Sequence, residues 1–520
     1  MKNFFVRYHL YLVGLGLTFL FFLYTFALTD NPPGFYVDES AFAYNAYSIA
    51  KTGASEFGVR WPLFFQNFEP PFKNFVNPVH IYLLAAFLLI LPPSIWLARL
   101  LSALAMFEAG LVMGFLAFKI SGKRTVAIIV GFTTLVTPWF FEFGRWFSDA
   151  SYYPLALALF LLAVFRASLK DRWSWVDVIC IGVTLGLLTY TYTIGRMLAP
   201  MLALGLVCFV TNKGRLVDVI KTWVAYGVTL LPFLIFYFRH PTALSSRFMT
   251  LSYFRTETTL QGILVRFLTR YFQDLSLYGL LIRGDINPRH HVPGATGSIL
   301  LATFILAIIG FALVLLHYRD KPWWRFIMFG TFVSVIPGAL TIDPFHTGRM
   351  IAYPIFLMVL TIPALEWLME KRENRSESAV KEQDLDLPKT VSRASSFSFR
   401  QAALIALLLG TVAQATYFQI KFWRDGYDRP YAWDAPYKEV YDTAVQMPSR
   451  PIYLVDGYWG PGYIHALWYA ALEGRSASEF VHLPYRTQPP PGALVISSDV
   501  GCTQCEILLD NGQYVLYRKL

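Results

Sequence analysis

The chain has 520 residues, of which 55% are hydrophobic and only 15% are charged, and its mean hydropathy is +0.45. Because roughly a quarter of the residues of soluble proteins are charged, this composition excludes an ordinary water-soluble protein. The net charge of +10 does not indicate nucleic-acid binding, because Lys and Arg gather in short loops between apolar runs, as membrane orientation signals do. The composition therefore predicts a polytopic integral membrane protein without a nucleic-acid partner.

The apolar runs predict about eleven transmembrane helices, since a helix needs on the order of 20 apolar residues to cross the hydrocarbon core. The predicted spans are residues 8–29, 94–118, 125–141, 150–167, 176–192, 197–211, 222–238, 297–316, 325–341, 349–369 and 401–419. The first run is too long for the core of a cleaved signal peptide, so we interpret it as an uncleaved anchor. Glu108, inside the second run, is predicted to face the bundle interior because a carboxylate in lipid is costly.

The predicted orientation depends on residues 76–91, a shorter apolar run that ends at Pro92-Pro93. If this run lies in the membrane interface, all basic loops fall on one side, as the positive-inside rule requires of cytoplasmic loops. These loops are the N-terminus and residues 119–124, 166–172, 213–221, 319–325 and 371–400. The sequence thus predicts a multi-pass plasma-membrane protein with a cytoplasmic N-terminus, an extracytoplasmic C-terminus and outer loops over residues 30–77 and 239–297.

The composition changes in the C-terminal part of the chain. Residues 371–400 are polar, Ser-rich and charged, which predicts a flexible cytoplasmic linker. Beyond the last span, over residues 420–520, strand-like runs alternate with Gly and Pro turns; the runs are residues 451–455, 493–496 and 514–517. The expected fold is therefore an all-α polytopic membrane bundle with a small α/β extracytoplasmic domain. Cys502 and Cys505 in that domain either form a short-loop disulfide or remain a free pair.

Two pairs of charged residues lie at span ends on the predicted outer face. Asp38 and Glu39 follow the first span, where acidic groups are costly unless they face water or a partner; the alternative is an ordinary solvated loop. Arg145 and Asp149 are four residues apart at the start of a span, so a helical turn would place them side by side. An intrahelical ion pair would account for both of these charges.

Basic residues on the same predicted face could bind an anion. Arg349 presents a planar fork that suits phosphate oxygens, and His346 could donate to the same anion, although interfacial snorkelling explains an Arg at a span end equally well. A second group in the long outer loop either helps to clamp a phosphate or is simply solvated; it comprises Arg283, Asp285, Arg289, His290 and His291. Adjacent histidines diverge on regular structure, so the last two residues do not favour a metal site.

At these residues the chain resembles the type C glycosyltransferases, and most closely the bacterial membrane proteins similar to protein O-mannosyltransferases (glycosyltransferase family 39) and aminoarabinose transferases. The resemblance spans roughly residues 1–370. It rests on the order of short motifs: Asp38-Glu39 in YVDESAFAYNA, residues 98–104 (ARLLSAL), Arg145/Asp149 after Thr137-Pro138, and the loop with His346 and Arg349. The sequence departs from the family at residues 75–80 (FVNPVH), where many members carry His-Pro or Lys-Pro-Pro.

The resemblance implies transfer of a sugar, with inversion, from a polyprenyl-phosphate donor to a protein, lipid or glycan acceptor on the extracytoplasmic face. It implies Asp38 as the general base for an acceptor hydroxyl, Glu39 as the residue that orients that base or the acceptor, and Asp149 as a second acidic residue facing the sugar. The residues that would hold the donor phosphate are Arg145, Arg349, His346 and Arg283. The resemblance gives no certain cofactor and leaves metal dependence open; a divalent metal, if one binds, would be held by Asp38 and Asp149.

Two other classes of protein fit a polytopic chain. A transporter or lipid flippase for a polyprenyl-linked glycan would show helix halves broken near the bilayer midplane or internal repeats, whereas the polar residues here gather at one face. A non-catalytic envelope-assembly protein would keep the topology without needing Asp38. The transferase hypothesis makes a geometric demand that these alternatives do not make: Asp38 and Arg349 must line one cavity at the outer membrane boundary.

Overall fold

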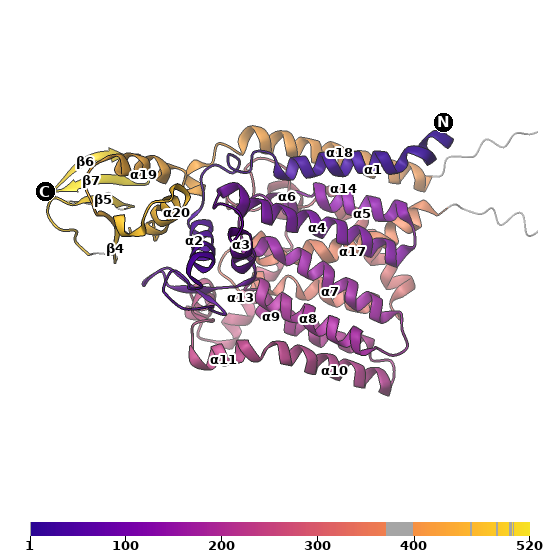
Figure 1. Ribbon diagram of the computed structural model, residues 1–520. Coiled ribbons are helices and arrows are strands. Elements are labelled where there is room, and N and C mark those ends of the chain that lie inside the picture. Colours follow the sequence, from indigo (N-terminus) through magenta and orange to yellow (C-terminus); the bar gives the residue numbers. More distant parts are fainter. Residues whose placement is uncertain (1, 371–398, 458–459, 485–486, 499–501, 503) are drawn as a thin grey trace, which may run out of the picture.

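The computed structural model describes residues 2–370, 399–457, 460–484, 487–498, 502 and 504–520, with side chains from residue 11 onward. It consists of a helical bundle with a small sheet domain at one end (Figure 1). The helices of the bundle are α1 (Lys2–Thr25), α2 (Val37–Thr52), α3 (Val79–Leu88), α4 (Ile95–Ser121), α5 (Arg124–Val136), α6 (Pro138–Phe143), α7 (Tyr153–Ser168), α8 (Trp175–Thr191), α9 (Gly195–Gly205), α10 (Lys213–Thr229), α11 (Leu231–Arg239), α12 (Ser246–Leu251), α13 (Leu260–Asp274), α14 (Leu301–Leu313), α15 (Pro322–Val333), α16 (Ile336–Ala339), α17 (Tyr353–Met369) and α18 (Phe399–Asp425).

Short helical turns and one hairpin complete the bundle. The turns that matter for the site are η1 (Asp149–Tyr152), η4 (Gly279–Arg283), η6 (Thr347–Met350) and η7 (Pro430–Trp433), and the hairpin is β1 (Phe65–Asn67) with β2 (Asn74–Val76). Local sequence signals set the helix ends. For example, α4 begins after Ser94, whose hydroxyl accepts a hydrogen bond from the Leu97 N–H, and ends at Gly122 in the left-handed conformation.

The length and composition of the helices make this an integral membrane protein. Four described stretches are long and apolar enough to cross a membrane: α4, Asp149–Ser168, Leu301–Tyr318 and α18. The α10–α11 pair, bent by 44°, adds a fifth if it is one span, and shorter apolar helices accompany these. The predicted number of about eleven spans stays a prediction.

The bundle has two different ends (Figure 1). The end that carries α2, α3 and the sheet is called the domain end here; α1 begins at the opposite end, where the basic α4–α5 and α7–α8 connections also lie. α3 has 10 residues, about 15 Å of helix, which is too short for a hydrocarbon core about 30 Å thick and agrees with an interfacial position for residues 76–91. The side of the membrane that each end faces stays a prediction.

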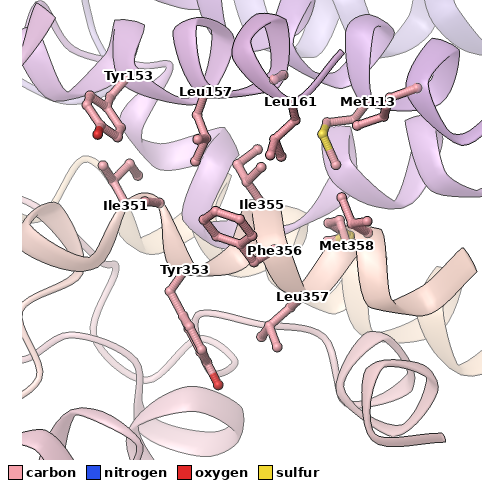
Figure 2. Close-up of a cluster of buried hydrophobic side chains, with 14 of the residues drawn as sticks. Met113, Tyr153, Leu157, Leu161, Ile351, Tyr353, Ile355, Phe356, Leu357 and Met358 are labelled. Atoms are coloured by element: carbon pink, nitrogen blue, oxygen red, sulfur yellow. The ribbon is translucent and has the colours of Figure 1, made fainter. Parts of the chain in front are cut away.

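α17 lies in the middle of the bundle and is buried on nearly all faces. In Figure 2, Leu157 and Leu161 of α7 point toward Ile355 and Phe356 of α17, and all four side chains are fully buried. On another side, Gly310 of α14 meets α17 so closely that a Cβ at this position would lie 1.7 Å from the Leu360 carbonyl oxygen. Only glycine permits this approach. By contrast, α18 exposes most of its apolar surface, as a lipid-facing helix does.

A five-stranded mixed sheet follows α18. Its order is β4–β3–β5–β7–β6, with β3 parallel to β4 and β5, and β7 antiparallel to β5 and β6. The elements are α19 (Pro436–Gln446), β3 (Ile452–Val455), α20 (Tyr463–Glu473), β4 (Phe480–Leu483), β5 (Leu494–Ser497), β6 (Cys505–Asp510) and β7 (Val515–Lys519). The strand-like runs of the sequence coincide with β3, β5 and β7. Cys502 and Cys505 form a disulfide, which was one of the two alternatives for this pair.

The expectation for Glu108 is wrong. This side chain is exposed on the surface of α4, which instead buries its small neighbours Ala105 and Ala109 against the bundle. The predicted linker over residues 371–400 lies outside the described residues except for its last two, which belong to α18.

A buried carboxyl group joins the loop between α2 and β1 to the sheet domain. Glu56 accepts a hydrogen bond from the Tyr463 hydroxyl of α20, and the Tyr463 ring stacks on His482 of β4. Burial raises the pKa of Glu56 to about 7, with the Glu69 and Asp456 carboxylates acting in the same direction and Tyr463 and His482 in the opposite one. The junction therefore favours a protonated Glu56.

We predict that this junction weakens as the pH rises. Because the pKa of Glu56 is higher in the folded protein than in an unfolded chain, its contribution to stability is complete below pH 4.5 and is lost as the pH rises through about 7. The protection factors of the β4 and α20 amides, which correct for the base-catalysed rise of intrinsic exchange with pH, should be lower at pH 8 than at pH 5 when measured in detergent. The Glu56→Gln variant should show a smaller difference between the two values; an equal difference in variant and wild type would contradict the assignment to Glu56.

Candidate active site

A cavity of about 220 Å³ lies at the domain end of the bundle. Segments far apart in the chain supply its walls: the start of α2, η1, α12, the loop after η4 and the turn η6. Its acidic, basic and histidine lining residues are Asp38, Asp149, Arg247, Arg289, His290, His346 and Arg349. Asp38 and Arg349 line the same cavity, as the sequence prediction requires, while its place at the outer membrane boundary stays a prediction.

The acidic side of the cavity consists of Asp38 and Asp149. Asp38 lies in the first turn of α2, where its Oδ1 accepts a long hydrogen bond of 3.5 Å from the Asn67 amide. Asp149 opens η1, and the charges of Asp38 and Arg247 both act on it. Next to them, burial and the Asp38 carboxylate raise the pKa of Tyr36 above its usual range, so this hydroxyl stays protonated and can donate to a ligand.

The basic side of the cavity consists of three arginines. Arg349 is only 9% exposed; it donates to the Thr341 hydroxyl at 2.7 Å and pairs with the exposed Asp343 at 2.8 Å. The Arg289 guanidinium lies over the Tyr36 ring, 4.0 Å from its centroid. Arg247, on α12, lines the cavity with them. A cavity with several guanidinium groups suits an anion such as a phosphate.

Glu39, one of the residues expected at the site, does not line the cavity. Its carboxylate is fully buried and accepts two hydrogen bonds from the Arg99 guanidinium, both at 2.9 Å. It also accepts the backbone N–H groups of Tyr36 at 3.0 Å and Phe147 at 2.8 Å. An orienting effect on Asp38 can therefore act only through the main chain of α2, and direct contact of Glu39 with an acceptor is excluded by these four donors.

Two arginines expected to hold the phosphate also lie elsewhere. Arg145 is not beside Asp149, because α6 ends at Phe143 and the intervening residues are not helical. Its guanidinium instead donates to carbonyl oxygens just before and after the end of α1, those of Leu23, Tyr24, Ala27 and Asn31. Arg283, at the end of η4, is exposed and is not among the residues that line the cavity.

The two adjacent histidines diverge, as expected. His291 bonds to Glu142 at 2.6 Å, whereas His290 bonds to Asp285 at 2.9 Å and lies next to His346. Asp285, His290 and His346 present ligand atoms within 4.8 Å of one another and could hold a metal ion. Neither Asp38 nor Asp149 belongs to this group, which was identified among the described residues. A metal ion held by Asp38 and Asp149 therefore stays a prediction.

Some residues of the site gave little or no signal in the sequence. Arg247 falls in the long loop that the sequence predicts over residues 239–297, with no motif around it, and Tyr36 is one of many aromatic residues near predicted span ends. Arg99 did carry a signal, because an arginine at the start of an apolar run needs a buried partner. The sequence did not reveal that this partner is Glu39.

The chain is similar to known glycosyltransferases in part of its sequence and in its fold. Residues 71–238 match the family model of dolichyl-phosphate-mannose-protein mannosyltransferases. No curated protein matches the chain by sequence. ArnT from Cupriavidus metallidurans is 12% identical and matches over 98% of both chains, with a TM-score of 0.57 for the apo state and 0.58 for the state bound to undecaprenyl phosphate.

A second relative in structure is the archaeal oligosaccharyltransferase AglB from Archaeoglobus fulgidus, solved with an inhibitory peptide and a dolichol-phosphate. It is 14% identical, with a TM-score of 0.55, over 90% of this chain and 64% of its own. AglB and ArnT are both type C glycosyltransferases. This chain has the type C glycosyltransferase fold. The resemblance expected from the sequence is thereby confirmed, and the fold extends beyond the family-model match to nearly the whole chain.

We predict that the Glu39–Arg99 pair is essential for stability. Removing one partner of a buried ion pair leaves an uncompensated charge and costs about 3–5 kcal/mol. Arg99→Met should therefore lower the free energy of unfolding in detergent by this amount. Glu506→Gln, which breaks the exposed Arg518–Glu506 pair, should cost at most about 1 kcal/mol. Similar losses in the two variants would show that the buried pair has no special role.

Proposed function

We propose that this protein is a glycosyltransferase that moves a sugar from a polyprenyl-phosphate donor to a protein, lipid or glycan acceptor. The observation that carries the proposal is the single cavity in which two carboxylates and three guanidinium groups meet. The ArnT and AglB structures support the donor class, since they were solved with undecaprenyl phosphate and dolichol-phosphate. The family model supports the same class through its dolichyl-phosphate-mannose description.

Asp38 is the proposed general base. It takes the proton of the acceptor hydroxyl while that oxygen forms a bond to the anomeric carbon of the sugar. The bond from the anomeric carbon to the phosphate oxygen breaks in the same displacement, so the configuration inverts and the polyprenyl phosphate leaves with the electron pair. Asp149 faces the sugar from η1, and the protonated Tyr36 hydroxyl is a donor to it.

Arg349, Arg247 and Arg289 are the proposed ligands of the donor phosphate, with His346 beside them. Negative charge develops on the phosphate as the sugar departs, and fixed guanidinium groups lower the energy of that state. In this assignment Arg247 and Arg289 take the roles that the sequence gave to Arg145 and Arg283.

The proposed site faces the extracytoplasmic side of the plasma membrane. The basic connections gather at the end of the bundle opposite the cavity, which by the positive-inside rule makes that end cytoplasmic. The position of the cavity also favours a transferase over a transporter or flippase, whose substrate site lies near the bilayer midplane. A non-catalytic assembly protein would not need a base and a phosphate site in one cavity.

The first test concerns the base. The Asp38→Asn variant, assayed in liposomes with a panel of undecaprenyl-phosphate-linked hexoses and pentoses, should release undecaprenyl phosphate at least about a hundredfold more slowly than wild type, because an amide cannot accept the proton. Asp320→Asn removes an exposed carboxylate at the other end of the bundle and should keep the wild-type rate. Unimpaired turnover by Asp38→Asn would sink the mechanism.

The second test concerns the phosphate. Arg349→Gln should raise the KM for the donor and the Kd for undecaprenyl phosphate roughly tenfold or more, since a charge-assisted hydrogen bond contributes about 1.5–3 kcal/mol. Arg283→Gln, an exposed arginine outside the cavity, is the matched control and should leave both constants unchanged. If Arg283→Gln weakens binding as much as Arg349→Gln, the phosphate has been assigned to the wrong arginines.

A further inference from the structure

Residues 426–434, which join α18 to the sheet domain and are called the connector here, contact residues that line the cavity or directly precede lining residues. Three side chains of the connector are buried: Arg429 and Asp434 are each 7% exposed, and Trp433 is 1% exposed. Buried charges of this kind need specific partners. Two of those partners are backbone groups of residues that directly precede cavity residues: the Val37 N–H before Asp38 and the Pro288 carbonyl before Arg289. The connector therefore contacts both the acidic and the basic side of the cavity.

Asp434 binds the start of α2. Its Oδ2 accepts the N–H of Val37, the first residue of α2, at 2.9 Å. The first N–H groups of a helix have no partner within the helix, and an acidic group there also suits the helix dipole. Val37 directly precedes Asp38. The other carboxylate oxygen accepts hydrogen bonds from Gln513 at 2.9 Å and Tyr514 at 3.1 Å, so the sheet domain holds Asp434 in place.

Arg429 binds the opposite side of the cavity. Its Nη1 donates to the carbonyl oxygen of Pro288 at 2.6 Å, while its Nε donates to Gly426 within the connector at 3.1 Å. Pro288 directly precedes Arg289, the cavity arginine that lies over the Tyr36 ring. The connector thus fixes the backbone beside one basic residue and beside one acidic residue of the site.

Trp433, the third buried side chain of the connector, also contacts the wall of the cavity. Its ring meets Trp146, which lines the cavity, edge to face at 5.5 Å. The main chain of the connector also comes close to the loop before α2: a Cβ on Gly34, whose φ is +75°, would lie 2.4 Å from the Trp433 carbonyl oxygen. Glycine is required there both for its backbone conformation and for the close approach.

We propose that Asp434 and Arg429 are positioning residues, through which the connector sets the places of Asp38 and Arg289 in the cavity; Asp434 also links the sheet domain to the site. The inference rests on the proposed function, and it assigns the two residues to different steps. Asp434 positions the base and so affects the chemical step. Arg429 positions a phosphate ligand and so affects donor binding.

The test compares Asp434→Ala with Asp442→Ala, an exposed aspartate of α19 in the same domain. Asp434→Ala should lower kcat between about tenfold and a hundredfold at a donor KM within twofold of wild type, because small displacements of a catalytic group are costly. Amide exchange over residues 37–40 should be faster in this variant, since the Val37 N–H loses its partner. Asp434→Asn keeps an acceptor oxygen and should recover most of the rate. Asp442→Ala should match wild type in both measurements.

Arg429→Gln should instead raise the Kd for undecaprenyl phosphate several-fold, with Arg475→Gln, a half-buried arginine of the sheet domain, as the control. Equal effects of Asp434→Ala and Asp442→Ala, or unchanged exchange over residues 37–40, would overturn the inference. So would an Asp434→Asn variant that is as slow as Asp434→Ala. Amide exchange and lipid binding need no turnover, so a wild-type protein inactive on every donor would reject the proposed function while these two measurements still judge the positioning.

Discussion

The buried ion pair of Glu39 and Arg99 is the constraint on which the domain end depends. Arg99 uses its donors on Glu39 and on the carbonyl oxygens of Leu28, Pro32 and Gly34, and both side chains are fully buried. Because an unpaired charge at this depth costs several kcal/mol, the loop between α1 and α2 is restricted to arrangements that satisfy all of these bonds. Phe147 donates to the same carboxylate, so the segment before η1 is tied to the pair as well.

This pair also explains how two carboxylates can share a cavity with three arginines. The fixed position of Glu39 sets the position of its neighbour Asp38, and that of Phe147 sets the position of Asp149 two residues later. The arginines belong to other elements: α12, η6 and the loop after η4. Among the described residues, no ion pair joins Asp38 or Asp149 to a cavity arginine. Because the two carboxylates and the three guanidinium groups are fixed on different elements, they do not form ion pairs with one another. Space and hydrogen-bonding groups therefore remain for a substrate.

Particular residues show how far the sequence could be used. Asp38, Asp149, His346 and Arg349 drew attention because charged residues at span ends are costly without a function or a partner, but it was the family resemblance that assigned them to one site. Arg145 was misplaced because its spacing from Asp149 was interpreted as one helical turn, whereas the chain leaves the helix after Phe143. Glu108 was misplaced because the cost of a carboxylate in lipid does not say which face of a long helix is covered.

Hydropathy and charge by themselves determined that the chain is a membrane protein and which of its segments are apolar. The alternation of residues also located the strands after the last span. These conclusions depend only on residues that are close together in the chain. The tertiary structure alone decided which charges face the cavity. Arg99 finds Glu39 60 residues away, and Asp434 finds Val37 397 residues away. Such contacts are selected by the packing of the whole bundle and leave no periodic pattern in the sequence, so a charged residue that supports the site looks the same in sequence as one that lines it.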